Sequence, residues 1–274
     1  MSPTERIPER SKVIPMHAKV HPTAIVAPGA QLGVNVEIGP YSIIGENVVI
    51  GDGTKIGAHV VIEGWTTIGK NNRIYTGAIV GNEPQDLKFK GEKSYLTIGD
   101  NNIIREYATI SRGTEGGGGE TRIGNNNLIM SYVHVAHDVQ MGSHIVISHG
   151  SGIAGHVVIE DRVVIGGLCG IHQFTKIGRM AMIGAHSMIT KDVPPYVLVK
   201  GNPPKLYGVN IVGMRRNGLP PEVRMEIQRA YKILYRSGLN VSQAIEEMER
   251  ELPGIEEIDH FLRFLRSAER GICR

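Results

Sequence analysis

An aliphatic residue recurs at every sixth position over most of this chain, and that period constrains the fold more than any other feature. Stepping by six gives unbroken aliphatic runs over 20–80, 98–110 and 123–189, twenty-six positions in all. A period of six matches neither the 3.6 residues of a helical turn nor the seven of a coiled coil. It is typical of hexapeptide-repeat solenoids.

We therefore expect a mainly β protein, a parallel β-helix in which each hexad is a short strand plus a turn and three hexads close one coil. Residues eighteen apart then stack, with roughly 4.8 Å between coils, so about eight or nine coils make a prism on the order of 40 Å long. The 35 glycines and only 5% aromatic residues suit tight turns around an aliphatic core. Cys169 falls in a core phase and is expected to be a packing residue rather than a reactive thiol.

The repeat also predicts the domain organisation. We assign 17–193 to the β-helix, with two loops interrupting it at 81–97 and 111–122, where the period breaks. After Lys191 the period stops, and proline pairs mark the start of a helical domain over 194–274. Three helices are expected there, the first stopped by Gly238, the second capped by Asn240 and the third ending near Arg270.

Composition excludes several classes of protein. The net charge of +3 is too balanced for a nucleic-acid-binding protein. No run of eighteen apolar residues occurs and the first sixteen residues are charged and proline-rich, so we expect neither export nor membrane insertion. Two cysteines cannot form a disulfide framework, which fits the cytoplasm. The segment from Lys200 to Arg236 contains eight Lys or Arg residues and only two Glu residues. This surplus of positive charge indicates either a solvated helical surface or a binding surface for an acidic partner.

The candidate chemistry lies in the third run, which contains seven of the eleven histidines. None occupies the buried phase, so these side chains lie at turns or on the outer wall. The eighteen-residue offset stacks His137 below Gly155 and then Gln173, and it stacks Asp138 below His156. A general base beside a carboxylate and a glycine amide is an arrangement for acyl transfer. Without an activated Ser or Cys nearby, direct attack by the substrate is favoured over a covalent intermediate.

Two other classes of protein stay open at this point. Trimeric parallel β-helices can hold zinc with three histidines across a subunit boundary, so a zinc enzyme of the carbonic anhydrase type is the alternative. The order of these histidines does not predict the convergence that a zinc site needs. A pure binding scaffold would leave the interrupting loops and the histidine cluster without a role.

Six segments in order resemble the UDP-N-acetylglucosamine O-acyltransferases of lipid A synthesis, a hexapeptide-repeat acyltransferase family, from about Val20 to the C-terminus. These segments are PQDLK at 84–88, HVAHD at 134–138, AGHV at 154–157, GGLCGIHQF at 166–174, DVPPYV at 192–197 and GVNIVGMRR at 208–216. The resemblance implies a left-handed β-helix and a homotrimer with active sites between the prisms. It implies no cofactor and no metal.

The resemblance also implies roles for individual residues. His137 is expected to act as the general base on the 3-hydroxyl of the sugar, Asp138 to orient it and the Gly155 amide to stabilise the oxyanion. The Gly167 amide is expected to contact the acyl donor. Sugar-nucleotide contacts map onto Asp86, Lys88, His134, His156, His172, Gln173, Asn210 and Arg216.

The donor implied by the resemblance is a 3-hydroxyacyl acyl carrier protein, an acidic partner that suits the basic helical segment. Ala185 falls where relatives vary the floor of the acyl pocket, and its small side chain favours a chain of about fourteen carbons over about ten. A histidine base could serve either a hydroxyl or an amine at the 3-position of the sugar.

Overall fold

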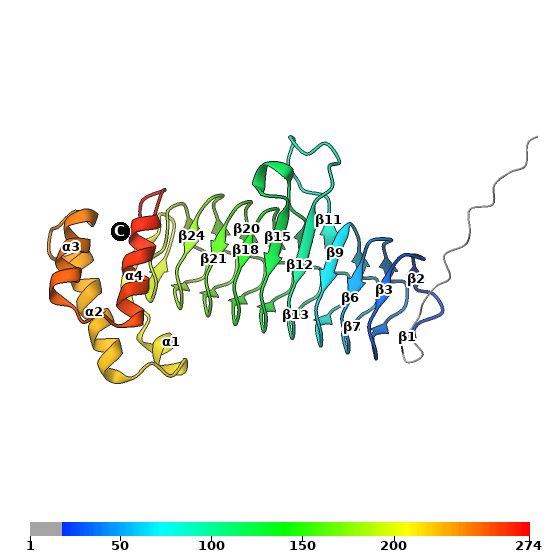
Figure 1. Cartoon of the computed structure of the whole chain (residues 1–274), viewed down its shortest axis with the longest axis horizontal. Coiled ribbons are helices and arrows are strands. Elements are labelled where there is room, and N and C mark those ends of the chain that lie inside the picture. The colour runs from blue at the N-terminus through cyan, green and yellow to red at the C-terminus, as the bar shows by residue number, and fades with distance from the viewer. Residues whose placement is uncertain (1–17) are drawn as a thin grey trace, which may run out of the picture.

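The computed structural model describes residues 18–274, and they form a long triangular prism with helices at its C-terminal end (Figure 1). Residues 1–17, over which the sequence predicts no signal peptide and at whose end the β-helix was expected to begin, lie outside the described residues. No helix within 18–274 combines the length and the apolar character needed to cross a bilayer.

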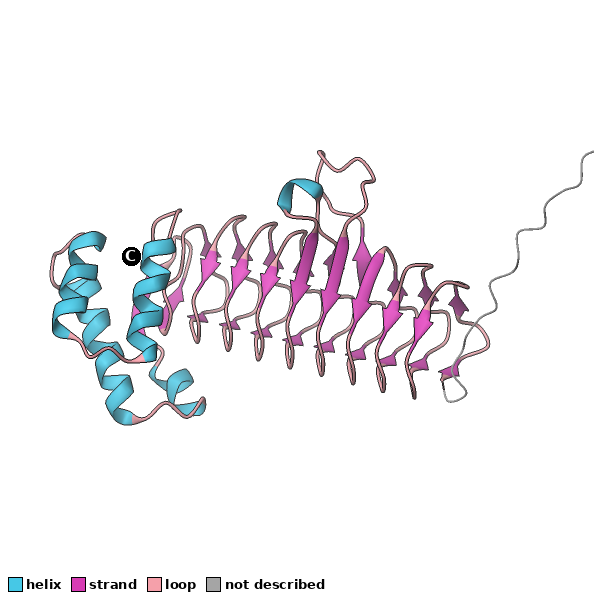
Figure 2. Cartoon of the chain, in the orientation of Figure 1, coloured by secondary structure: helices cyan, strands magenta, loops and turns pink. Residues whose placement is uncertain are grey.

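Three sheets form the walls of the prism, and successive strands visit them in turn (Figure 2). Sheet A contains β1 (Lys19–Val20), β4 (Glu37–Ile38), β7 (Lys55–Ile56), β10 (Arg73–Ile74), β13 (Ile103–Ile104), β16 (Leu128–Ile129), β19 (Val146–Ile147), β22 (Val164–Ile165), β25 (Met182–Ile183), β27 (Val197–Lys200) and β28 (Lys205–Val209). Sheet B contains β2 (Ile25–Val26), β5 (Ile43–Ile44), β8 (Val61–Ile62), β11 (Ile79–Asn82), β14 (Thr109–Ser111), β17 (His134–Val135), β20 (Gly152–Ile153), β23 (Gly170–Ile171) and β26 (Met188–Ile189). Sheet C contains β3 (Gln31–Leu32), β6 (Val49–Ile50), β9 (Trp65–Ile68), β12 (Tyr95–Ile98), β15 (Glu120–Ile123), β18 (Gln140–Met141), β21 (Val158–Ile159) and β24 (Lys176–Ile177).

The expected stacking at eighteen residues is present in the strand register. Val20 pairs with Ile38 and Val135 with Ile153, both in parallel ladders. The second residue of most two-residue strands points inward, because side chains alternate across a strand. Twenty-five of the twenty-six repeated aliphatics are buried, and Val20 at the open end is half-buried. Cys169 is buried in the same core, as expected.

Two loops leave the prism on the same side (Figure 1). The first loop spans 83–94, because β11 and β12 extend into the interval over which the period breaks. The second loop spans 112–119 and contains a 3-10 turn, Glu115–Gly117. Arg112 joins them: its buried guanidinium donates to the Gly81 carbonyl and lies over the ring of Phe89. The loops are therefore fixed against each other at their bases.

The C-terminal part begins with more sheet, since β27 and β28 form an antiparallel hairpin that extends sheet A past Val193. Four helices follow, one more than the sequence indicated: α1 (Ile211–Arg216), α2 (Pro221–Arg236), α3 (Val241–Glu251) and α4 (Glu256–Ser267). Asn240 caps α3 in a reciprocal capping box, as expected. Polar contacts tie α4 to the prism, including His260 with Glu160 at 2.8 Å and Arg179 with Glu256 at 3.0 Å.

Candidate active site

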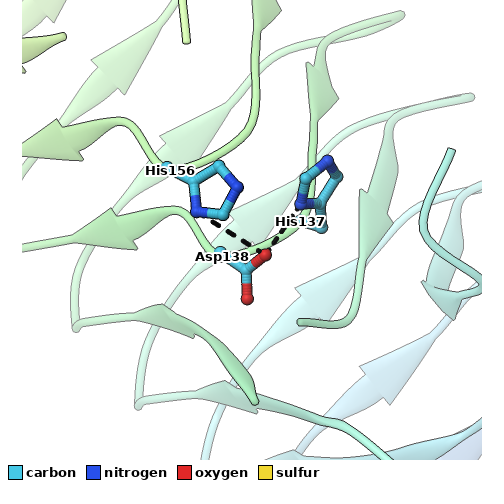
Figure 3. Close-up of side chains that lie close together, drawn as sticks. All are labelled: His137, Asp138 and His156. Carbon is cyan, nitrogen blue, oxygen red and sulfur yellow. Dashed lines mark hydrogen bonds and ion pairs between the residues drawn. The ribbon is translucent and has the colours of Figure 1, made fainter. Parts of the chain in front are cut away.

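Consecutive coils bring the candidate catalytic residues together at one corner of the prism (Figure 3). His137 and Asp138 form the turn after β17, and Gly155 and His156 form the turn one coil further. The His156 amide donates to the His137 carbonyl over 3.1 Å, which fixes the vertical offset. The rings of His137 and His156 meet edge to face, with centroids 5.1 Å apart. The stacking predicted from the repeat is therefore confirmed here.

His137 and Asp138 form a hydrogen-bonded pair. His137 Nδ1 lies 2.7 Å from Asp138 Oδ2, and the aspartate side chain is fully buried. Asp138 occupies a left-handed turn position with φ of 60°, which Asp tolerates better than most residues. Because the carboxylate accepts a hydrogen bond from Nδ1–H, the neutral ring keeps Nε2 unprotonated. Nε2 is then able to accept a proton from a substrate.

Thr114, in the second loop, completes the surroundings of Asp138. Its amide donates to Oδ1 over 2.8 Å and its hydroxyl to Oδ2 over 2.7 Å. The Asp138 amide donates to Thr121 Oγ1 over 2.7 Å. Neither threonine was singled out from the sequence, and only the glycine-rich break in the repeat beside Thr114 signalled that this loop has a role.

The arrangement suits proton transfer better than metal binding. Ligand atoms of His137, Asp138 and His156 do lie within 4.8 Å of one another. However, both carboxylate oxygens of Asp138 already accept hydrogen bonds, from Thr114 and from His137. A metal would have to displace these N–H and O–H donors from a buried carboxylate, at the cost of leaving them unpaired. The zinc alternative is therefore not favoured.

A groove of about 500 Å³ runs beside His137 on the outer face of sheet B. The outward column there is His134, Gly152, Gly170 and Met188, paired in register. Gly152 and Gly170 have no side chains to fill the space between His134 and Met188, so the outer face of sheet B is concave there. The lining includes Gln85, His134, His137, Gly155, His172, Gln173 and Met188.

A second cavity of about 390 Å³ lies between the two loops. Asp86, Lys88, Thr114 and His156 line it, so the candidate residues divide between two neighbouring hollows around the His137 pair. Gly167, Asn210 and Arg216 line neither hollow.

Asn210 has a structural role within this chain. Its side chain caps α1 by accepting from the Gly213 amide, and it donates to the Met180 carbonyl over 2.9 Å. Arg216 ends the same short helix and is exposed. The sequence did not predict α1, because its two turns are too short for a helical period to be recognised.

Burial changes the titration of two of these histidines. Burial lowers the pKa of His134 below its usual value of 6.5, and positive charge on His137 lowers it further. Burial also lowers the pKa of His156, although the Asp138 carboxylate opposes this effect. Both rings are therefore held neutral in the folded chain at pH values where exposed histidines gain a proton.

We expect His134 to make the folded state less stable in acid. Below about pH 6.5 the unfolded chain binds a proton at His134 that the folded chain does not, so the free energy of unfolding falls as the pH decreases. His134→Gln should therefore lose less stability than the wild type between about pH 7.5 and 5.5, measured by urea unfolding. His144→Gln, at an exposed turn, is the control. Equal losses in the wild type and His134→Gln would contradict the expectation.

A solenoid of hexapeptide repeats that presents an imidazole–carboxylate pair beside an open groove defines a hexapeptide-repeat transferase. The family model for bacterial transferase hexapeptide repeats matches residues 47–82 and 120–155. The model described as UDP-N-acetylglucosamine O-acyltransferase, domain 2, matches residues 192–273. The chain belongs to the UDP-N-acetylglucosamine O-acyltransferase family.

Full-length relatives support this assignment. The chain is 50% identical over 255 residues to the acyl-[acyl-carrier-protein]--UDP-N-acetylglucosamine O-acyltransferase of Anaeromyxobacter dehalogenans, covering 93% of this chain and 99% of that protein. It is 49% identical over 259 residues to the protein of that name from Xylella fastidiosa, covering 93% and 97%. The structure of LpxA from Acinetobacter baumannii superposes with a TM-score of 0.90 at 47% identity, covering 93% and 99%. The expected fold class, a left-handed parallel β-helix with a C-terminal helical domain, is confirmed.

Proposed function

We propose that this chain transfers a 3-hydroxyacyl group from acyl carrier protein to the 3-hydroxyl of UDP-N-acetylglucosamine, the first step of lipid A biosynthesis. The observation that carries the proposal is the His137–Asp138 pair beside the groove, in a chain about half identical to enzymes named for that reaction. Both cysteines are buried and unpaired, which suits the reducing cytoplasm where we place the enzyme.

In the proposed mechanism, His137 Nε2 removes the proton of the sugar hydroxyl as its oxygen attacks the thioester carbonyl. Asp138 stabilises the imidazolium that forms. The Gly155 amide has no acceptor within residues 18–274, so it is free to donate to the oxyanion. When the tetrahedral intermediate collapses, the carbon–sulfur bond breaks and the imidazolium returns its proton to the thiolate. The products are the O-acyl sugar nucleotide and the free thiol of the carrier.

We propose that the sugar nucleotide contacts both hollows. Histidine, glutamine, aspartate and lysine side chains supply the donors and acceptors that a sugar nucleotide needs, and the Gly167 amide would contact the acyl donor. The residues proposed for the sugar nucleotide are Asp86, Lys88, His134, His156, His172, Gln173, Asn210 and Arg216. Arg216 suits a phosphate, because its planar fork binds two oxygens. Exposed basic residues on and around α1 and α2 would bind the acidic carrier protein.

We also propose a homotrimer, supported by two apolar stripes on the outside of the prism. Strands β2 to β11 of sheet B and β13 to β25 of sheet A turn large aliphatic side chains outward, whereas sheet C presents mainly polar ones. The outward aliphatics are Ile25, Ile43, Val61 and Ile79 on sheet B, and Ile103, Leu128, Val146, Val164 and Met182 on sheet A. In a cyclic trimer sheet B of one protomer would meet sheet A of the next. The neighbour's stripe would then cover the open side of the groove.

Ile43→Asp should therefore dissociate the trimer and remove most of the activity, because it buries an unpaired charge in the proposed interface. Analytical ultracentrifugation measures the assembly, and an acyltransfer assay measures the activity. Val49→Asp, an outward position on sheet C, should change neither. A wild-type chain that sediments as a monomer would contradict the proposal.

The function is tested by assaying the purified protein with a 3-hydroxyacyl carrier protein and either UDP-N-acetylglucosamine or its 3-amino analogue. Mass spectrometry of the product identifies the acyl linkage. We expect an ester on the 3-oxygen of the hydroxyl acceptor. Transfer to the amine alone, or to neither acceptor, would show the proposed function to be wrong.

Ala185 leads us to expect a preference for long acyl chains. It lies at an exposed position in the turn between β25 and β26, one coil above Gly167, whose amide is proposed to contact the acyl donor. A panel of carrier-bound donors should give the highest kcat/KM near about fourteen carbons rather than about ten. Ala185→Met should shift the preference toward shorter chains, since its longer side chain would shorten the proposed acyl site. A wild-type preference for ten carbons would contradict the expectation.

A further inference from the structure

Thr114 donates two hydrogen bonds to the buried Asp138 carboxylate, one to each oxygen. Its amide hydrogen goes to Oδ1 over 2.8 Å and its hydroxyl to Oδ2 over 2.7 Å. The last torsion of an aspartate is intrinsically broad, so a single contact would leave the carboxylate free to rotate. Two contacts on different oxygens fix its plane. Oδ2 is also the oxygen that lies 2.7 Å from His137 Nδ1.

The second loop is built to hold Thr114 in place. The Gly113 amide donates to the Tyr95 carbonyl over 3.0 Å, and the Tyr95 amide donates to the Gly119 carbonyl over 2.8 Å. Both ends of the loop are therefore hydrogen-bonded to the first residue of strand β12. The Gly119 amide closes the turn onto the Thr114 carbonyl over 2.8 Å. Gly117 lies directly against the carboxylate: a Cβ there would come within 2.0 Å of Asp138 Cγ. The glycine-rich sequence is thus explained by close packing on Asp138.

We propose that Thr114 is a positioning residue for the His137–Asp138 pair, fixing the carboxylate so that Oδ2 accepts the hydrogen bond from Nδ1–H of His137. The inference rests on the proposed function, in which Nε2 of His137 must be unprotonated to accept the substrate's proton. The neutral ring has two tautomers, and only the one protonated at Nδ1 can act as base. A carboxylate held at Nδ1 selects that tautomer. Thr114 therefore contributes to catalysis through Asp138 and His137.

The test replaces Thr114 with Val and with Ser. Val keeps the shape and the amide but removes the hydroxyl, so kcat should fall about tenfold while KM stays within about twofold. Thr114→Ser should restore kcat, because it returns the hydroxyl. Thr54→Val is the matched control, since Thr54 is buried and its hydroxyl donates to the Gly69 carbonyl within the first coils. It should lower stability without changing kcat.

A second readout separates positioning from a general structural role. Nitrogen-15 NMR of histidine-labelled protein above about pH 8 reports which ring nitrogen of His137 carries the proton. The wild type and Thr114→Ser should show the Nδ1-protonated form, and Thr114→Val should show an increased share of the other tautomer. An unchanged tautomer and unchanged kcat in Thr114→Val would overturn the proposal. If the wild type transfers no acyl group, the proposed function fails, and the NMR comparison still decides whether Thr114 orients the pair.

Discussion

Replacing His137 with Ala is expected to lower kcat for acyl transfer by about 100-fold to 10,000-fold. The reason is that the imidazole hydrogen-bonded to the buried Asp138 carboxylate beside the groove is lost, and with it the general base. A steady-state assay with saturating acceptor and donor measures the change. Retention of more than a few per cent of the wild-type rate would exclude His137 as the base.

The fold of His137→Ala should survive, which makes the loss interpretable. His137 is in an outward turn, and Asp138 keeps both hydrogen bonds from Thr114 when the imidazole is removed. We expect the free energy of unfolding to change by about 1 kcal/mol, the typical net contribution of one hydrogen bond. Circular dichroism and sedimentation should match the wild type. A variant that unfolds or dissociates would show that His137 stabilises the assembly instead.

Gly155→Ala is expected to lower kcat by about 100-fold although it leaves the proposed oxyanion donor, the backbone amide, in place. A Cβ at this position would come within 2.6 Å of His137 Cε1 and 2.8 Å of Nε2. The imidazole would have to move, and a displacement of about 1 Å in a catalytic group can cost about 100-fold in rate. Gly254→Ala, at an open position in the helical domain, is the control and should retain full activity.

A double-mutant cycle tests whether Gly155→Ala acts through the imidazole. In a His137→Ala background the added methyl group has no ring to displace, so Gly155→Ala should cost much less than in the wild type. Additive losses would mean that the methyl group acts on the oxyanion or the substrate instead. The cycle therefore separates the positioning of the base from stabilisation of the intermediate.

The hexapeptide period made the prism predictable because each buried position is repeated in every coil. One rule then fixes the strand register and the core together, and the stacking of Gly155 on His137 followed by counting alone. The expected roles of individual residues came from the segments that resemble the acyltransferase family. The hydrogen bond between His137 and Asp138 is consistent with the roles expected for these two residues. Gly155 gains support because its amide is unpaired within the described residues.

The two breaks in the repeat could be predicted to form loops, but the conformation and contacts of these loops could not be predicted. Outside the repeat, no regular offset tells which residues meet, so Thr114 could not be assigned to Asp138, 24 residues away in the chain. For the same reason the role of Arg112 could not be predicted: its guanidinium joins the two loops by lying over the ring of Phe89. The structural use of the Asn210 side chain at the start of α1 also depends on a distant contact, the Met180 carbonyl.

The period of six is enough to predict the solenoid, its aliphatic core and the vertical neighbours of each turn, because a strict period converts spacing along the chain into position in space. The folded chain was needed to show which loop atoms hold the buried carboxylate, which polar side chains line each of the two hollows, and that β27 and β28 prolong the sheet beyond the repeat. These features depend on contacts between irregular segments. Such contacts are chosen by packing and hydrogen bonding in three dimensions, which no local pattern encodes.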